Sequence, residues 1–432
     1  MPMPARWSLL TRLAFRFTVV YFVLYVVCTQ MLWGLISIPI EIPGVQNLET
    51  LPPLRQIITW FAVHAFGANA ATLQITPTGS GDKTYDYAEA FAFLALAAIG
   101  TVIWSLLARR REHHTGTYKW FRLFLRFALG STMLEYGMVK AFPMQMPAPS
   151  LGRLLEPFGN MSPMGVLWAS IGASRSYETF AGLMELTAAV LLFIPGITTF
   201  AAMFCFAVVV QVFVYNMTYD VPVKLFSFHL IVMCLVLLAP ETKRLWNFLI
   251  VNRATEPSSV PPLVQSRRGQ RILIAAQLIF AMYLLGIGVY GANQRWKTSG
   301  VTAPKPPLYG MWLVDTMQID GHTRSPLITD YDRWRRVLFP VPNRISFQRM
   351  NTDIVNYSIK HDTNAHTLTL SKPTDKNWTA NFTYTQPKPD RLIMNGTMDN
   401  HPIKMELTLE DHTKMLLLSR GFHWIQEVPF NR

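Results

Sequence analysis

Apolar runs of membrane length fill most of the sequence before residue 291, and they restrict the possible folds more than any other feature. Half of the 432 residues are hydrophobic and only 15% are charged, which is too apolar for an ordinary soluble chain of this size. Lipid admits only helices or closed barrels, and a helix needs about 20 apolar residues to cross it. The sequence therefore predicts an all-α multi-span membrane bundle of about seven transmembrane helices. These are expected at 17–38, 87–107, 121–142, 177–194, 197–215, 225–239 and 272–290.

Basic residues beside these runs predict the orientation of the chain. Arg6, Arg12 and Arg16 precede the first run, and Arg-Arg-Arg-Glu-His-His at 109–114 follows the second. Residues 241–270 form another basic linker. Lys and Arg are enriched in cytoplasmic loops. We therefore expect a multi-pass protein of the inner (plasma) membrane, with a cytoplasmic N-terminus and an extracytoplasmic C-terminal domain. The same distribution explains the net charge of +13 without a nucleic-acid partner.

Polar and ionisable residues interrupt the runs between residues 122 and 230. An ionisable group at bilayer depth costs at least about 2.5–3.5 kcal/mol, so it usually faces a cavity or a partner. The pattern predicts a polar interior site, and polar contacts between helices without chemistry are the alternative. The groups expected to carry chemistry are Lys140, Glu178, Glu185 and His229. The groups expected to bind a substrate are Arg126, Glu135, Tyr136, Gln145, Glu156, Gln211, Tyr215, Asp220 and Lys224.

The chemistry of these side chains suits a quinone head group. Such a ring needs a hydrogen-bond donor at each carbonyl and an acid for the proton, and Lys140 and Tyr136 could donate while Glu178 or Glu185 shuttles. Each has a structural alternative. Glu178 and Lys224 could be interfacial, and Glu135 with Lys140 could form a structural ion pair with other helices. Asp220 and Lys224 could pair across a turn if their segment is helical.

Residues 143–176 contain too many prolines to cross a bilayer. Ser162-Pro163 is typical of a helix start, with serine as the N-cap and proline at the first helical position, and Ser176 could cap the next helix. We expect either a folded extracytoplasmic lid or a re-entrant hairpin, because irregular backbone at membrane depth must be satisfied by protein or water.

Several cofactor classes lack their sequence signals. The three cysteines stand singly within apolar runs, without a CxxC. A membrane haem with two axial histidines would need a second intramembrane histidine besides His229. Walker, Gly-x-Gly-x-x-Gly and Gly-x-Ser-x-Gly motifs are missing. No haem, metal or nucleotide cofactor is therefore predicted, and what remains is a set of proton-handling side chains.

The composition changes at residue 301, after a Pro-rich spacer. Short alternating segments separated by turn residues predict an antiparallel β-barrel or sandwich. A barrel of this size could hold one small ligand or be filled by side chains. The predicted strands are 309–314, 344–348, 354–359, 367–370, 380–384, 391–396, 404–409 and 415–420.

Strings within the polar region resemble the DoxX-type integral membrane proteins. They are YGMVK at 136–140, QMPAP at 145–149, LLEPFG at 154–159, SPMG at 162–165, FAGLMEL at 180–186 and YDVPVKLFSFHL at 219–230. The segments 326–340 and 416–431 are similar to the tail of longer DoxX-type proteins. The resemblance implies a link to quinone-coupled sulfur or oxygen redox complexes, and hence a redox partner protein.

Two shorter resemblances concern single features. The Tyr-Gly-x-x-Lys ending at Lys140 is similar to the membrane domain of vitamin K-dependent carboxylase relatives, which implies an active lysine. Gly310-x-Trp312 together with Arg420 in the last predicted strand is similar to the lipocalin Gly-x-Trp and its packing arginine, which implies a lipocalin-like barrel.

These observations give five predicted regions. They are two N-terminal helices with an outer loop (1–115), a DoxX-like core (116–240), a cytoplasmic linker (241–270), a seventh helix (271–291) and an extracytoplasmic β domain (301–432). The expected function is a quinone- or isoprenoid-binding subunit of a membrane oxidoreductase system, in contact with the bilayer and a lipophilic small molecule. The alternatives are a lipid- or prenyl-modifying enzyme with Lys140 as base, and a non-catalytic anchor that presents a ligand-binding β domain.

Overall fold

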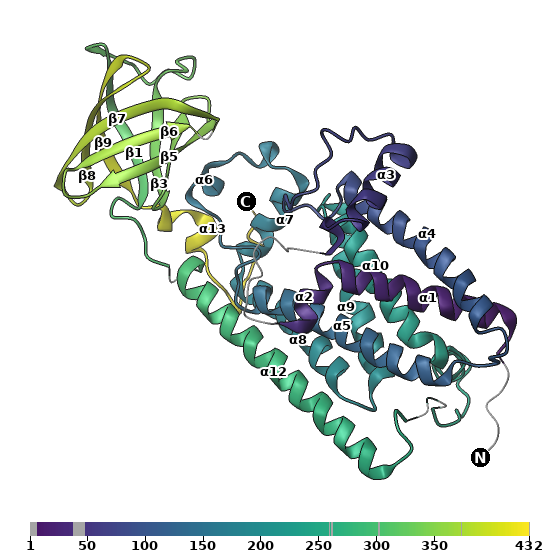
Figure 1. Ribbon diagram of the computed structural model, residues 1–432. Helices are drawn as coiled ribbons and strands as arrows, with labels where there is room; N and C mark the ends of the chain where they lie inside the picture. Colours follow the sequence, from purple (N-terminus) through teal and green to yellow (C-terminus); the bar gives the residue numbers. More distant parts are fainter. Residues whose placement is uncertain are drawn as a thin grey trace. The chain divides into compact units, whose positions relative to one another are not determined.

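The chain forms a helical unit and a second unit that contains a β-barrel (Figure 1). The computed structural model describes residues 7–37, 48–258, 260, 262–300, 303–372 and 374–431. The helical unit comprises Met1–Phe142 and Thr179–Arg295, and the second unit comprises Pro143–Glu178 and Trp296–Arg432. The end of the first predicted span at residue 38, and Arg6, lie outside the described residues.

The helices of the first unit pack as antiparallel neighbours. Helix α1 runs along α4, α9 runs along α10, and both α2 and α10 contact α5. Small residues permit close approach, as where Gly130 of α5 faces the ring of Phe193. The helices are α1 (Leu9–Cys28), α2 (Met31–Ile36), α3 (Leu54–Phe66), α4 (Thr84–Leu107), α5 (Thr115–Ala141), α8 (Arg175–Phe193), α9 (Thr198–Thr218), α10 (Lys224–Leu238), α11 (Thr242–Leu249) and α12 (Arg267–Ser299).

Five helical segments of the described chain are long and apolar enough to cross a bilayer. They are Leu9–Cys28, Thr84–Leu107, Thr198–Thr218, Lys224–Leu249 and Arg267–Ser299. This agrees with a helical membrane protein, although the count is five rather than seven. Helices α5 and α8 fall short of this set because they carry charged residues such as Arg126, Lys140 and Glu185, all of which are buried.

The first predicted span is not one continuous helix. Helix α1 ends at Cys28, and α2 begins only at Met31. Both the backbone N–H and the Oγ1 of Thr29 donate to the carbonyl of Tyr25, at 3.2 and 2.7 Å, and Thr29 itself is extended. The prediction of one continuous span was wrong here, and the sequence carries no proline or glycine at the break to indicate it.

The proline-rich segment after α5 folds into short elements. Ser150 caps α6 (Leu151–Leu155) and Ser162 caps α7 (Pro163–Gly172), with Pro163 at the first helical position as predicted. Between them lies the 3-10 helix η2 (Phe158–Asn160). Helix α8 begins at Arg175, so Ser176 lies inside its first turn rather than at its cap.

Eight antiparallel strands of the second unit close into a barrel. The order is β1-β3-β4-β5-β6-β7-β8-β9, and β9 pairs back with β1, while the two-residue strand β2 adds to β1. Closure leaves the eight strands without a free edge. The strands are β1 (Gly310–Ile319), β2 (His322–Thr323), β3 (Trp334–Val341), β4 (Arg344–Arg349), β5 (Ile354–Asp362), β6 (Thr367–Lys372), β7 (Asp375–Lys388), β8 (Arg391–Met398) and β9 (His401–Glu410).

Side chains fill the inside of this barrel. Alternate residues of the strands point inward and form one core that includes Trp312, Phe347, Phe382 and Met405, each at most 1% exposed. Gly310 has a φ of +145°, and a Cβ there would lie 2.6 Å from Leu409. A glycine two residues before the buried Trp312 is therefore required by the backbone.

The last predicted strand, 415–420, is not a strand. The sheet ends at Glu410, and Asp411 then caps the 3-10 helix η4 (His412–Lys414). Leu416–Ser419 form the short helix α13, and Arg420 contacts His423 and Gln426 instead of lying in a strand. Strand β3 lies within the segment 326–340 and was not among the eight strands given by range, because two arginines, Arg335 and Arg336, obscure its alternation.

Candidate functional site

A cavity of about 410 Å³ lies within the helical unit. It is bounded by the end of α1, the start of α4, the C-terminal part of α5, the start of α10 and the loop before α4. Its lining residues are Tyr25, Thr29, Gln30, Thr50, Ile75, Pro77, Gly79, Ser80, Gly81, Lys83, Tyr85, Asp86, Glu89, Tyr136, Val223, Leu225 and Phe226. Its volume falls within the range of about 300–1,000 Å³ that is typical of small-molecule sites.

Tyrosines and one acid supply most of the buried polar surface of the cavity. Tyr25 is 4% exposed, Tyr85 is 2% exposed and Glu89 is 7% exposed. Tyr85 and Glu89 are four residues apart on α4, so they share one face of that helix. Tyr136 reaches the cavity from α5. An apolar wall with a few convergent hydroxyl and carboxyl groups can both bind a ring and exchange a proton with it.

The break after α1 contributes directly to this cavity. Thr29 and Gln30 both line it, and Gln30 donates from Nε2 to the hydroxyl of Tyr136 at 3.4 Å. The predicted span 17–38 was continuous and placed no break at these residues. The contribution of the break to the cavity wall was therefore not predicted.

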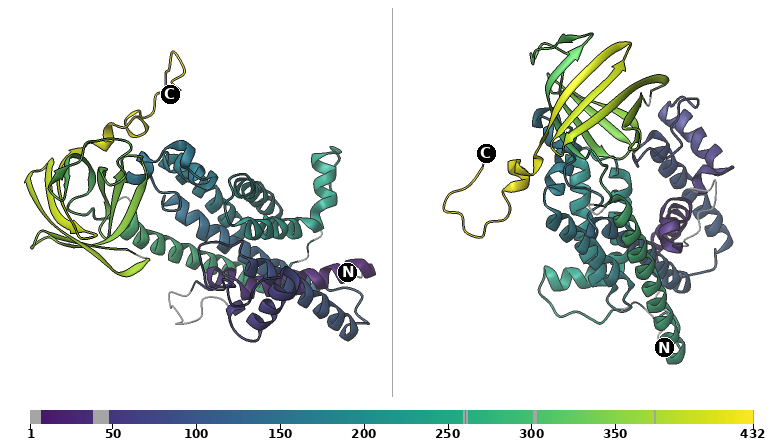
Figure 2. Two further views of the ribbon diagram at one scale, coloured as in Figure 1. Left: turned by 90° about the horizontal axis from the view of Figure 1, so that it is seen from above. Right: turned by 90° about the vertical axis from the view of Figure 1, so that its left-hand side faces the viewer.

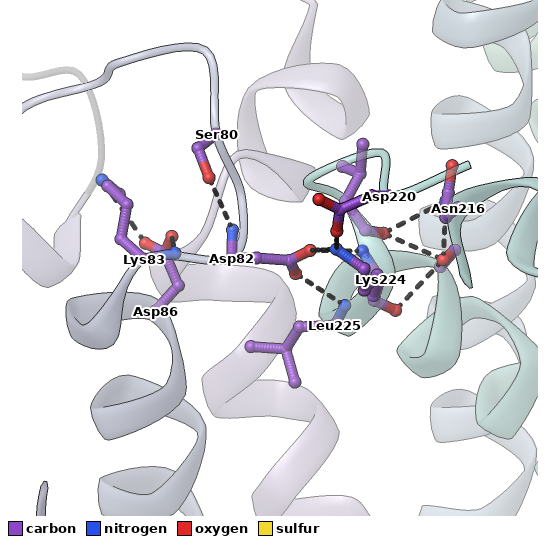
Figure 3. Close-up of polar contacts among 10 residues, drawn as sticks. Ser80, Asp82, Lys83, Asp86, Asn216, Asp220, Lys224 and Leu225 are labelled. Carbon is purple, nitrogen blue, oxygen red and sulfur yellow. Dashed lines mark hydrogen bonds and ion pairs between the residues drawn. The ribbon is translucent and has the colours of Figure 1, made fainter. Parts of the chain in front are cut away.

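The loop before α4 is fastened to the start of α10 (Figure 3). The carboxylate of Asp82 accepts from the backbone N–H groups of Lys224 and Leu225, both at 2.9 Å, and so caps α10 across 142 residues of sequence. The Nζ of Lys224 lies 3.6 Å from Asp82 and 2.9 Å from Asp220. The predicted pair of Asp220 and Lys224 is thus present, with Asp82 as a third member.

Asp82 is a residue beside the cavity whose role in capping α10 sequence reasoning missed. It stands just before a helix, where an aspartate ordinarily caps that helix. In this protein Asp86 takes that role, since it accepts from the N–H of Lys83 at 2.8 Å. The presence of two acids, at 82 and 86, was the available signal that one of them had another partner.

Lys140 and Glu185 form a buried ion pair behind the cavity. The Nζ of Lys140 lies 2.7 and 2.8 Å from the two carboxylate oxygens, and the side chains are 8% and 4% exposed. The pair forms because α5 and α8 approach closely, with Gly182 against the backbone of Ala141. The ammonium also lies 5.6 Å from the ring centre of Tyr136. The predicted acid and base therefore meet each other, and they reach the cavity through Tyr136.

His229 lies behind the opposite wall of the cavity. Its Nδ1 contacts the carbonyl of Leu225 at 2.7 Å, and its Nε2 contacts the hydroxyl of Tyr21 at 2.6 Å. A carbonyl can only accept, so Nδ1 carries the proton and Nε2 accepts from Tyr21. The ring stacks on Tyr25 with centres 4.0 Å apart and planes 6° apart. His229 thus positions Tyr25 and does not itself line the cavity.

Four other predicted residues of the helical unit lie away from this cavity. Arg126 is 6% exposed and donates to Gln277 of α12 and to Thr198 at 3.4 Å. Glu135 is exposed on α5 and lies close to Gly34. Gln211 is exposed, and its Nε2 donates to the partly buried Tyr215 at 3.1 Å, one turn further along α9.

The remaining three predicted residues stabilise the segment 143–178. The Oε1 of Glu178 accepts from the N–H of Met146 at 2.8 Å. The carbonyl of Gln145 accepts from Trp168 at 3.0 Å, and Glu156 pairs with Arg153 at 2.6 Å. These contacts hold turns and short helices together, which matches the structural alternative for Glu178.

Metal-binding groups do not gather anywhere in the described ranges: no three His, Cys, Asp or Glu side chains are close enough to hold an ion. The chemistry available to the cavity is therefore that of tyrosine hydroxyls, the carboxylates of Asp86 and Glu89, the Lys83 amine, and the Lys140–Glu185 pair behind Tyr136.

Comparison with known proteins gives one relative whose length is largely covered. No family model and no solved structure matches the chain. A stretch of 133 residues is 32% identical to the "Uncharacterized protein YwoB" of Bacillus subtilis (strain 168), and covers 29% of this chain and 76% of that relative. The name of the relative states no activity. At this identity and coverage, the chain belongs to the same protein family as the Bacillus subtilis protein YwoB.

Proposed function

We propose that this protein is a DoxX-like integral membrane protein that binds a quinone or isoprenoid lipid in the cavity of its helical unit, as a subunit of a membrane oxidoreductase system. The observation that carries the proposal is the combination in one cavity of three tyrosines and a buried glutamate, Glu89. Tyrosine hydroxyls donate to quinone carbonyls, and a carboxyl group can take or supply the proton that accompanies reduction. The partner protein would supply the electrons.

The proposed topology has seven crossings. Helices α5 and α8 complete the five apolar spans, because their charged side chains Lys140 and Glu185 satisfy each other inside the bundle rather than facing lipid. Seven crossings from a cytoplasmic N-terminus in the inner membrane place the barrel outside. Support comes from Arg109–Arg111 and the basic residues Arg267 and Arg268 at helix ends that would then be cytoplasmic.

The geometry of Lys140 favours binding over lipid-modifying catalysis. A lysine that acts as a base must hold a free electron pair, whereas this amine is held by both oxygens of a buried carboxylate. We propose that the closed pair fixes the position of Tyr136, whose ring centre lies 5.6 Å from the Lys140 ammonium, so that its hydroxyl is held in the cavity. Such a role needs no proton transfer from Lys140 itself.

The filled interior of the barrel also weighs against the non-catalytic alternative, in which the β domain holds the ligand. We propose a lipocalin-type barrel in which Gly310-x-Trp312 opens the first strand and the indole donates to the carbonyl of Leu308 at 2.9 Å. Since side chains such as Trp312, Phe347 and Phe382 occupy its centre, the helical cavity is the better candidate for a ligand.

A quinone titration tests the proposal. The purified full-length protein in nanodiscs is titrated with short-chain ubiquinone and menaquinone analogues while intrinsic tryptophan fluorescence is followed. Tyr136→Phe removes one hydroxyl and so one hydrogen bond to the quinone. The loss of a bond of about 0.5–1.5 kcal/mol should raise the Kd about 2–10-fold. Tyr215→Phe on α9, away from the cavity, is the matched control and should bind as the wild type does. Equal affinity of all three proteins, or no saturable binding, would refute the proposal.

A further inference from the structure

Large apolar side chains are exposed on the chain after the barrel. We call residues 416–431 the C-terminal tail; it extends away from the strands in Figure 2. Trp424 is 88% exposed, Phe422 80%, Ile425 77% and Val428 73%. Soluble surfaces rarely gather such residues, and where they do the surface is usually an interaction site.

The register of the barrel places the start of this tail. Met311 of β1 pairs with Glu410 of β9, so the chain leaves the barrel at the end where β1 begins. Only residues 300–309 separate Gly310 from Ser299, the last residue of α12, and α12 is a candidate span. An extended chain covers at most about 3.3–3.6 Å per residue. This end of the barrel is therefore tied by a short linker to a helix that can cross the bilayer.

A second connection reaches the same end of the barrel. Leu151 of α6 packs in one cluster with Met311 of β1 and Leu338 of β3, and Met415 joins them just before the tail. Helix α6 follows α5 by nine residues, 142–150. Two separate links from the helices thus meet the barrel where the tail begins.

We infer that the C-terminal tail lies in the interfacial layer of a lipid bilayer and attaches the barrel to the membrane surface. Trp and Phe are the residues enriched in that layer, and leucine and isoleucine gain free energy from the acyl boundary below it. Lys414 and Arg420 flank the exposed leucines and can approach anionic head groups. The partner of this surface is lipid, and the attachment is independent of any ligand in the helical cavity.

Site-directed spin labelling of the full chain tests the inference. The three cysteines, Cys28, Cys205 and Cys234, are buried and form no disulfide, so they are first replaced by alanine. A nitroxide is then attached through Trp424→Cys in one protein and through Asn364→Cys, an exposed barrel loop, in the other. Both proteins are reconstituted in nanodiscs that contain phosphatidylglycerol and phosphatidylcholine, and collision rates with oxygen and with a water-soluble nickel chelate are measured.

The label at 424 should collide more often with oxygen than with the nickel chelate, and the label at 364 should show the reverse. Oxygen dissolves preferentially in lipid, which is why the ratio inverts. A label at 424 that is as open to the chelate as the label at 364 would overturn the inference. So would a label at 424 that is immobilised yet shielded from both reagents, because that result indicates a protein partner or a second copy of the chain.

Discussion

At the residue scale, the sequence indicated several ionisable side chains that are buried, but not the partners that they meet on other helices. Lys140, Glu185 and His229 were singled out because an ionisable group within an apolar run needs a partner. All three are buried. Their partners follow from the packing of separate helices, as for His229 with Tyr21 at a separation of 208 residues. Such pairings depend on tertiary contacts, which local periodicity does not encode.

The Lys140–Glu185 pair gives the first prediction. Lys140→Met leaves a buried carboxylate without its counter-ion and should destabilise the helical unit by about 3–5 kcal/mol. The double variant Lys140→Met, Glu185→Leu should recover most of that loss, since an apolar pair of similar volume replaces the ions. Arg153→Gln is the control, because it removes the Arg153–Glu156 ion pair, in which each side chain is about one third exposed. It should change stability by only about 0–1 kcal/mol.

Thermal unfolding in detergent, followed by the loss of helical circular dichroism, measures these differences. A double variant as unstable as the single one would show that the charges do more than compensate each other. A single variant as stable as the wild type would show that the pair is not closed in the protein.

The barrel gives a prediction on pH. Two bonds from the Arg336 guanidinium, at 2.6 and 3.0 Å, lower the pKa of Glu410 below its ordinary value of 4.5, against the opposing effect of burial. A folded-state pKa below the unfolded one adds stability above about pH 4.5, and that stability is lost as the pH falls through the folded value. The protection factors of the β1 and β9 amides, which correct exchange for its intrinsic pH dependence, should therefore fall more steeply below pH 4.5 in the wild type than in Glu410→Gln.

Glu427→Gln, which changes an exposed carboxylate of the tail, serves as the control for that experiment. Its exchange in β1 and β9 should follow the wild type at every pH. Identical acid dependence in Glu410→Gln and the wild type would contradict the assigned role of the Arg336–Glu410 pair.

At the scale of the elements, prediction succeeded where local signals are strong. The Ser162-Pro163 start of α7 was found as expected, because capping residues act over a few residues. The break at Thr29 and the short helix α13 were missed. Neither is marked by a proline or glycine at the point where the regular element ends, at Thr29 in one case and at Asp411 in the other.

The crossing of α5 and α8 gives a prediction at this scale. A Cβ on Gly182 would lie 2.2 Å from the backbone nitrogen of Ala141, which cannot move as a side chain would. Gly182→Ala should therefore push the two helices apart and cost about 1–3 kcal/mol of stability. Gly286→Ala in α12 meets nothing within 4 Å and should be neutral or slightly stabilising.

The same thermal unfolding assay compares the two glycine variants. Because Gly182 lies beside the Lys140–Glu185 pair, its replacement should also weaken quinone binding through Tyr136. Equal stability of Gly182→Ala and Gly286→Ala would contradict the close packing of α5 on α8.

At the scale of the whole molecule, the division into a helical region and a β domain could be read from the change in composition near residue 301. The grouping of residues 143–178 with the barrel could not. That grouping depends on α6 and its Leu151, which packs on strands about 160–190 residues further along the chain. A sequence pattern shows that such a segment is too broken to cross a bilayer, and it does not show which surface the segment will cover.

The cavity likewise emerges only at this scale. Its walls come from α1, α4, α5 and α10 and from two loops, and only Tyr136 among its lining residues was predicted as a site residue. The other predicted groups stand behind it, with His229 stacked on Tyr25 and Lys140 beside Tyr136. The sequence therefore predicted charged residues that lie behind the cavity. The residues that line the cavity could be identified only from the fold.

Mass spectrometry of the lipids that copurify with the full-length protein in a gentle detergent tests the central claim most directly. The wild type and the Tyr215→Phe control should carry a quinone or isoprenoid lipid in a near-stoichiometric amount, well above its share of the membrane. Tyr85→Phe combined with Tyr136→Phe keeps the rings but removes two hydroxyls, and should retain clearly less. Bulk phospholipid alone in all three preparations, in the proportions of the membrane, would contradict the account.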